Sequence, residues 1–243
     1  MNSQAVTITV DGSPMPAYLA RPDGDDPRPA VIVLQEIFGV NREVKRITDL
    51  VAAAGYVGLA VNYYHRTDPD LNEPYTAEGL QNGFAAAGAV TKATLRADIK
   101  AAIEWLNAQA YVHRNRIATW GFCFGGTVAF VTATLDGLCG AICFYGGNIA
   151  QALPDGEAAP IGEAAAIQTP LLLAFGGKDE YIPAEAIENI REALTAAGKN
   201  FRIQVYPDQG HAFFRDSIDA FDSSADIADA WDLVQAFLTD HFR

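Results

Sequence analysis

The sequence is short of the features that mark membrane proteins and secreted, disulfide-bonded proteins. No apolar stretch reaches the roughly 20 residues that a membrane-spanning helix needs. Residues 1–6 carry neither the basic nor the apolar region of a signal peptide, and there are only 3 cysteines, without framework spacing. These absences predict a cytoplasmic protein with reduced thiols, and we expect a monomer or a weak homodimer.

Positive charge is also scarce. The 243 residues include 17 Lys and Arg against 30 Asp and Glu, which gives a formal net charge of −13, and there is no basic cluster. This balance argues against nucleic acids and anionic membranes as partners. An anionic substrate would be repelled at long range, so it would need a cationic group inside the site.

Motifs for metals and nucleotides are missing as well. The 4 histidines (His65, His113, His211 and His241) are scattered, without metal-ligand spacing. Neither G-x-G-x-x-G nor G-x-x-x-x-G-K-[ST] occurs. We therefore expect no metal site and no cofactor.

The sequence does contain a regular alternation of short apolar runs and amphipathic segments. A hairpin is expected at 6–10 and 15–20, and buried strands at 29–34, 56–61, 116–120, 140–145, 170–175 and 201–206. Helices are expected at 42–54, 93–109, 127–135, 184–197 and 225–242. A long polar connection is expected at 62–88. This order predicts an α/β fold in one domain, residues 1–243, with a doubly wound, mostly parallel sheet flanked by helices.

The most informative motif is Gly121-Phe122-Cys123-Phe124-Gly125-Gly126, at the junction of a predicted strand and a predicted helix. It has the pattern of the G-x-S-x-G nucleophile elbow, with sulfur in place of oxygen. Flanking glycines suit such a turn because neighbouring backbone leaves no room for a Cβ atom. A lone cysteine is usually a small core residue, which is how we interpret Cys139 and Cys143. The elbow context makes Cys123 a candidate nucleophile.

Two further polar residues follow the elbow in the order nucleophile, acid, histidine. Asp179 comes after the apolar run at 170–175, and His211 comes after the run at 201–206. Each could be an ordinary turn residue when taken alone. Because the carboxyl ends of parallel strands share one edge of a sheet, we expect Cys123, Asp179 and His211 to converge there.

Together with Gln35-Glu36-Ile37-Phe38-Gly39-Val40-Asn41, directly after the strand at 31–34, these motifs strongly resemble the dienelactone hydrolase (carboxymethylenebutenolidase) family. The resemblance implies an α/β-hydrolase fold and a Cys–His–Asp triad that opens a lactone. It implies Cys123 as nucleophile, His211 as base and Asp179 as the acid that orients the base. The backbone N–H groups of two further residues, Ile37 and Phe124, are implied as the oxyanion hole.

The resemblance also assigns two charged residues. Glu36 corresponds to a family glutamate that contacts the cysteine and influences its protonation; otherwise it is a polar loop residue. Arg215 corresponds to an arginine that binds the substrate carboxylate, and a guanidinium can grip a carboxylate through two hydrogen bonds. The second carboxylate-binding arginine of the dienelactone-degrading members has no counterpart, because residues 71–90 contain no Arg or Lys. Dienelactone itself is therefore in doubt as the substrate.

The expected substrate is a small-molecule ester or lactone, with or without a carboxylate. Phe38 and Tyr145 lie in or beside the motifs and either line an apolar pocket or belong to the core. Three alternatives remain: a broad carboxylesterase for small neutral esters, a non-catalytic small-molecule binding protein, and a redox-sensing cysteine.

Overall fold

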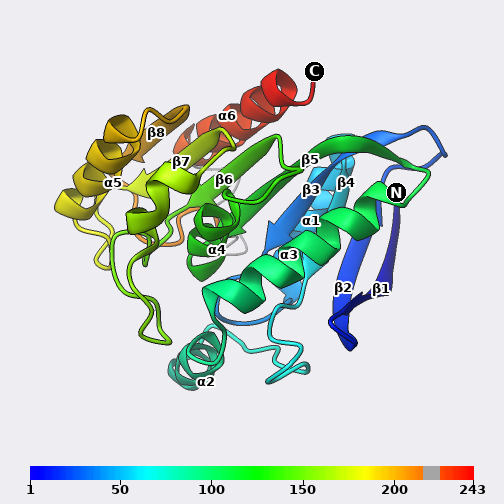
Figure 1. The fold of residues 1–243 in the computed structure, drawn as a ribbon, viewed down its shortest axis with the longest axis horizontal. Helices are drawn as coiled ribbons and strands as arrows, with labels where there is room; N and C mark the ends of the chain where they lie inside the picture. The colour runs from blue at the N-terminus through cyan, green and yellow to red at the C-terminus, as the bar shows by residue number, and fades with distance from the viewer. Residues whose placement is uncertain (216–224) are drawn as a thin grey trace.

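The computed structural model of the chain describes residues 1–215 and 225–243, and its eight strands form one sheet (Figure 1). The strand order in the sheet is β1-β2-β4-β3-β5-β6-β7-β8. The strands are β1 (Asn2–Val10), β2 (Ser13–Arg21), β3 (Arg28–Leu34), β4 (Val57–Val61), β5 (Val112–Phe122), β6 (Gly140–Phe144), β7 (Leu171–Gly176) and β8 (Phe201–Tyr206). The β1–β2 and β2–β4 pairs are antiparallel, and the pairs from β4 to β8 are parallel. The predicted doubly wound, mostly parallel sheet is confirmed.

Helices cover both faces of this sheet (Figure 1). They are α1 (Arg42–Ala53), α2 (Ala77–Ala87), α3 (Lys92–Asn107), α4 (Phe124–Thr132), α5 (Ala184–Ala196) and α6 (Ala225–His241), with a 3-10 turn at Pro160–Ala166. Within the described ranges, no helix has the length and apolar character needed to cross a membrane. The expected helices agree with the observed ones to within a few residues. Asn41, for example, caps α1 by accepting hydrogen bonds from the N–H groups of Glu43 and Val44.

The expectation of a purely polar connection at 62–88 was incomplete, because this segment contains α2. The helix begins at Thr76, whose hydroxyl accepts a hydrogen bond from the N–H of Gly79. Its sequence resembles a loop because glycines weaken a helix. Packing explains why residue 83 is a glycine, because a Cβ atom there would lie 2.7 Å from the carbonyl oxygen of Ile37. The glycine lets α2 rest directly on the chain that follows β3.

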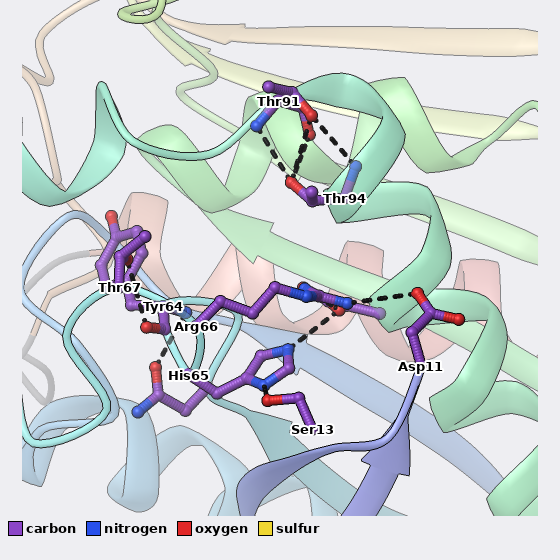
Figure 2. A network of polar contacts seen from close by, with 10 residues as sticks. Asp11, Ser13, Tyr64, His65, Arg66, Thr67, Thr91 and Thr94 are labelled. Atoms are coloured by element: carbon purple, nitrogen blue, oxygen red, sulfur yellow. Dashed lines mark hydrogen bonds and ion pairs between the residues drawn. The ribbon is translucent and has the colours of Figure 1, made fainter.

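A buried polar network ties the N-terminal hairpin to the segment after β4 and to α3 (Figure 2). Asp98 of α3 accepts a hydrogen bond from Arg66 at 2.6 Å and lies 3.1 Å from Nε2 of His65. Nδ1 of His65 lies 3.2 Å from the hydroxyl of Ser13, and Arg66 also reaches Asp11 at 3.6 Å. Burial raises the pKa of Asp98, although His65 and Arg66 act to lower it. The network holds the chain that leaves β4 at the catalytic edge of the sheet.

We predict that Asp98→Ala destabilises the protein by about 3 kcal/mol, because it leaves His65 and Arg66 without their shared acceptor. Urea unfolding measures this loss. The control is Asp208→Ala, which removes only an exposed ion pair with Lys178. Equal midpoints for the two variants would contradict a structural role for the network.

Candidate active site

Cys123 occupies the tight turn between β5 and α4, as the motif predicts. Its backbone has φ 53° and ψ −117°, a conformation that non-glycine residues rarely adopt. The N–H of Cys123 donates to the carbonyl of Phe144 at 3.0 Å, which anchors the turn to the neighbouring strand β6. The turn therefore holds the cysteine in one strained position at the carboxyl edge of the sheet.

Two glycines of the motif make this turn possible. A Cβ on Gly121 would overlap the backbone carbonyl of Gly125. A Cβ on Gly125 would lie 2.5 Å from the carbonyl oxygen of Gln35 and closer still to that of Leu34. These obstacles are backbone atoms, which cannot rotate away. The structure thus gives the expected reason for glycine on both sides of the cysteine.

Cys123, His211 and Asp179 come together as the chain order predicts. Nε2 of His211 lies 3.2 Å from Sγ of Cys123, and Nδ1 lies 2.8 Å from Oδ2 of Asp179. The other oxygen of Asp179 accepts hydrogen bonds from the N–H groups of Tyr181 and Ile182 at 2.8 and 3.2 Å. Both carboxylate oxygens are therefore occupied, so the imidazole faces an acid of fixed orientation.

The surroundings of His211 favour its protonated form. Burial by itself lowers the pKa of this histidine, but hydrogen bonds and charge interactions with Asp179 and Cys123 raise it. The net effect raises the pKa of His211 from 6.5 to about 10. The protonated imidazole thus places a positive charge 3.2 Å from Sγ of Cys123.

The two residues expected to supply the oxyanion donors line the cavity that Cys123 also lines. Phe124 is the first residue of α4 and Ile37 follows β3, and both line the same cavity as Cys123. Neither N–H group donates a hydrogen bond within the described ranges, so both can serve a ligand. The hydroxyl of Tyr63 donates to the carbonyl of Gln35 and supports the loop that holds Ile37. Sequence reasoning missed Tyr63, because the backbone carbonyl that its hydroxyl binds lies 28 residues away in the chain.

Glu36 pairs with Arg215, and among the described residues no hydrogen bond joins Glu36 to Cys123. Nη2 of Arg215 donates to Oε1 of Glu36 at 2.9 Å, while Oε2 of Glu36 is buried without a hydrogen-bond partner. The guanidinium is the cation that balances this buried carboxylate. Its carbon also lies 3.8 Å from the centre of the Tyr75 ring and 5.7 Å from that of Phe38.

These groups surround a cavity of about 530 Å³. Its wall is formed by Ile37, Phe38, Tyr75, Thr76, Ala77, Leu80, Phe84, Cys123, Phe124, Gly147, Asn148, Gln151, Pro154, Tyr181, His211, Ala212 and Arg215. Phe38 belongs to the wall, but Tyr145 lies behind it, 1% exposed, with its ring 5.3 Å from that of His211. Sequence reasoning missed Tyr75, Phe84 and Tyr181. In the part of the chain that the structure describes, no three His, Cys, Asp or Glu residues are grouped to hold a metal ion.

A comparison with protein-family models matches residues 15–242 to the dienelactone hydrolase family. The chain belongs to the dienelactone hydrolase family. A Synechocystis protein named "Putative carboxymethylenebutenolidase" is 36% identical over 236 residues, which cover 97% of this chain and 96% of that protein. An Escherichia coli protein of the same name is 35% identical, with 93% and 82% covered.

A solved structure agrees with this assignment. The crystal structure of "Putative Dienelactone Hydrolase" from Klebsiella pneumoniae superposes with a TM-score of 0.87 at 30% identity and covers 98% of each chain. The predicted α/β-hydrolase fold is thereby confirmed. As a member of the dienelactone hydrolase family, the protein is a carboxylic ester hydrolase.

We predict that His211 titrates with a midpoint near pH 10, which ¹⁵N NMR of its imidazole ring can measure. The pKa of His211 in the folded protein exceeds the ordinary value of 6.5. The protonated imidazole therefore contributes its full stabilisation of the fold below pH 6.5. This stabilisation is lost as the pH rises through about 10. Asp179→Asn and Cys123→Ala should each lower the midpoint. A wild-type midpoint near 6.5 would refute this account of the site.

We predict that Gly125→Ala lowers the free energy of unfolding by about 2 kcal/mol or more, because the added methyl group meets backbone carbonyls. Denaturant unfolding measures the change. Gly162→Ala is the matched control, since nothing lies within 4 Å of its Cβ position. If Gly125→Ala unfolds at the same midpoint as the control, the close approach at the elbow is not a constraint.

Proposed function

We propose that this protein hydrolyses small carboxylic esters or lactones through a thioester on Cys123. The observation that carries the proposal is the position of His211, within hydrogen-bond distance of both Cys123 and Asp179 at the wall of a cavity. A nucleophile, a base and an orienting acid in this order meet the geometric requirements for acyl transfer.

In the first step the Cys123 thiolate, paired with the His211 imidazolium, attacks the ester carbonyl carbon. The carbonyl π electrons move to oxygen, and the N–H groups of Ile37 and Phe124 donate hydrogen bonds to the resulting oxyanion. Each such donor contributes about 3 kcal/mol to transition-state stabilisation. Because the donors are backbone groups held by α4 and by the loop after β3, they need no reorganisation when charge develops.

In the second step the tetrahedral intermediate collapses, the ester C–O bond breaks and His211 gives its proton to the leaving oxygen. A thioester remains on Cys123. His211 then takes a proton from a water molecule, which attacks the thioester carbonyl. Breakage of the C–S bond returns the thiolate and releases the carboxylic acid, with the proton on His211 again.

The remaining site residues have supporting roles in this proposal. Asp179 keeps Nδ1 of His211 protonated, and Tyr145 packs against the imidazole from behind. Phe38 contributes apolar wall on the substrate side. Glu36 is held by Arg215, which lines the same cavity as Cys123.

We predict that Cys123→Ala lowers kcat/KM for 4-nitrophenyl acetate by at least about 1,000-fold, because the covalent route is lost. Mass spectrometry of the wild-type enzyme, quenched during turnover, should find an acetyl group on Cys123. The control is Cys139→Ala, because the sulfur of Cys139 hydrogen-bonds to the carbonyls of Asn115 and Ile117 at the opposite end of the strands. Hydrolysis that survives Cys123→Ala would overturn the proposal.

A further inference from the structure

Tyr181 is the most exposed aromatic side chain in the described wall of the cavity. It is 59% exposed, against 51% for Phe84 and 41% for Tyr75. Exposed apolar rings that gather around one opening mark a surface that a ligand covers. The neighbours of Tyr181 indicate which part of a substrate covers it.

Tyr181 differs from the other two exposed rings in its contact with the imidazole of His211. The two ring centres lie 5.0 Å apart, with an angle of 70° between the ring planes. Among the described aromatic side chains, Tyr145 also contacts this imidazole, but it is 1% exposed and lies behind it. Tyr181 is therefore the ring that an incoming molecule meets beside His211.

The backbone of Tyr181 is anchored on the acid that orients His211. Its N–H donates to Oδ1 of Asp179 at 2.8 Å, and the N–H of Ile182 donates to the same oxygen at 3.2 Å. Oδ2 of Asp179 lies 2.8 Å from Nδ1 of His211. One carboxylate thus fixes both the imidazole and the backbone that carries the neighbouring tyrosine ring.

In the proposed reaction, the alcohol part of the substrate lies on the His211 side of the cavity. The leaving oxygen receives its proton from Nε2 of His211, so it must come within hydrogen-bond distance of this atom. The acyl part is held elsewhere, because its carbon is bonded to Sγ of Cys123 and its oxygen faces the N–H groups of Ile37 and Phe124. The group attached to the leaving oxygen therefore extends past Tyr181.

We infer that Tyr181 forms the subsite for the alcohol part of the ester and favours an alcohol that carries an apolar ring. Aromatic side chains pack well against such rings, by stacking or by edge contact. The inference rests on the proposed function and deepens it by naming a specificity-determining residue. In a lactone the alcohol part stays attached to the acyl chain, so the subsite takes the substituent on the carbon next to the ring oxygen.

The first test compares two acetate esters that form the same acyl-enzyme, 4-nitrophenyl acetate and trifluoroethyl acetate. The ratio of their kcat/KM values reports the alcohol part, since effects that both esters share cancel. Tyr181→Leu should lower this ratio by about tenfold, because it removes the ring that packs against the nitrophenyl group. Tyr181→Phe keeps the ring and should keep the ratio. An unchanged ratio in Tyr181→Leu would overturn the inference.

Two controls locate the subsite. Phe84→Leu removes a similarly exposed ring from α2, one that is not among the described rings in contact with His211, and should leave the ratio unchanged. The butanoate and acetate of 4-nitrophenol share an alcohol part, so Tyr181→Leu should not alter the ratio between these two esters. A change in this acyl ratio without a change in the alcohol ratio would assign Tyr181 to the acyl part and contradict the inference.

The same subsite should also accept an alcohol in the reverse direction, which leads to acyl transfer. His211 takes the proton of the bound alcohol, whose oxygen attacks the thioester carbonyl. Breakage of the C–S bond then returns the Cys123 thiolate and releases a new ester. With 4-nitrophenyl acetate and equal concentrations of benzyl alcohol and methanol, the wild type should form more benzyl acetate than methyl acetate. Tyr181→Leu should lower this product ratio, measured by gas chromatography, and equal ratios in the two proteins would count against the subsite.

Cys123→Ala accompanies each assay and separates failure of the proposed function from failure of this inference. If no ester shows Cys123-dependent hydrolysis, the proposed function is wrong. If hydrolysis depends on Cys123 and Tyr181→Leu changes neither the alcohol ratio nor the product ratio, this inference alone is wrong.

Discussion

The site depends on one close approach of backbone to backbone, where the turn after β5 passes the end of β3. Gly125 lies against the carbonyls of Leu34 and Gln35, at a distance that no Cβ atom tolerates. This contact brings the start of α4 to the loop that contains Ile37. As a result, the proposed nucleophile and both proposed oxyanion donors belong to two segments that cannot separate without opening the sheet.

Much of the fold and the convergence of Cys123, Asp179 and His211 could be predicted because the relevant signals are local in sequence. The central strands are buried on both faces and are therefore continuously apolar, and the elbow pattern fixes its own geometry. The side-chain partners could not be predicted in the same way. Glu36 and Arg215 are 179 residues apart, and only packing decides that they meet. Helix α2 was missed for a related reason, since Gly83 weakens the local helix signal in order to fit against Ile37.

Electrostatics in this protein operate on two scales. The net charge of −13 acts over long distances and is screened by salt. Inside the site, Glu36 is matched with Arg215, and Asp179 with His211, at 2.9 and 2.8 Å. The short pairs hold the charged side chains of the candidate site in place.

The contact between α2 and the carbonyl of Ile37 also bears on how such an enzyme can diversify. One face of α2 presents Leu80 and Phe84 to the cavity, whereas Gly83 presses on the loop that carries an oxyanion donor. Substitutions on the first face alter which molecules fit and leave the donor where it is. A side chain at Gly83 would displace the backbone of Ile37. A single short helix thus carries, on separate positions, the side chains that shape the cavity and the contact that fixes the loop after β3, so the first can change without disturbing the second.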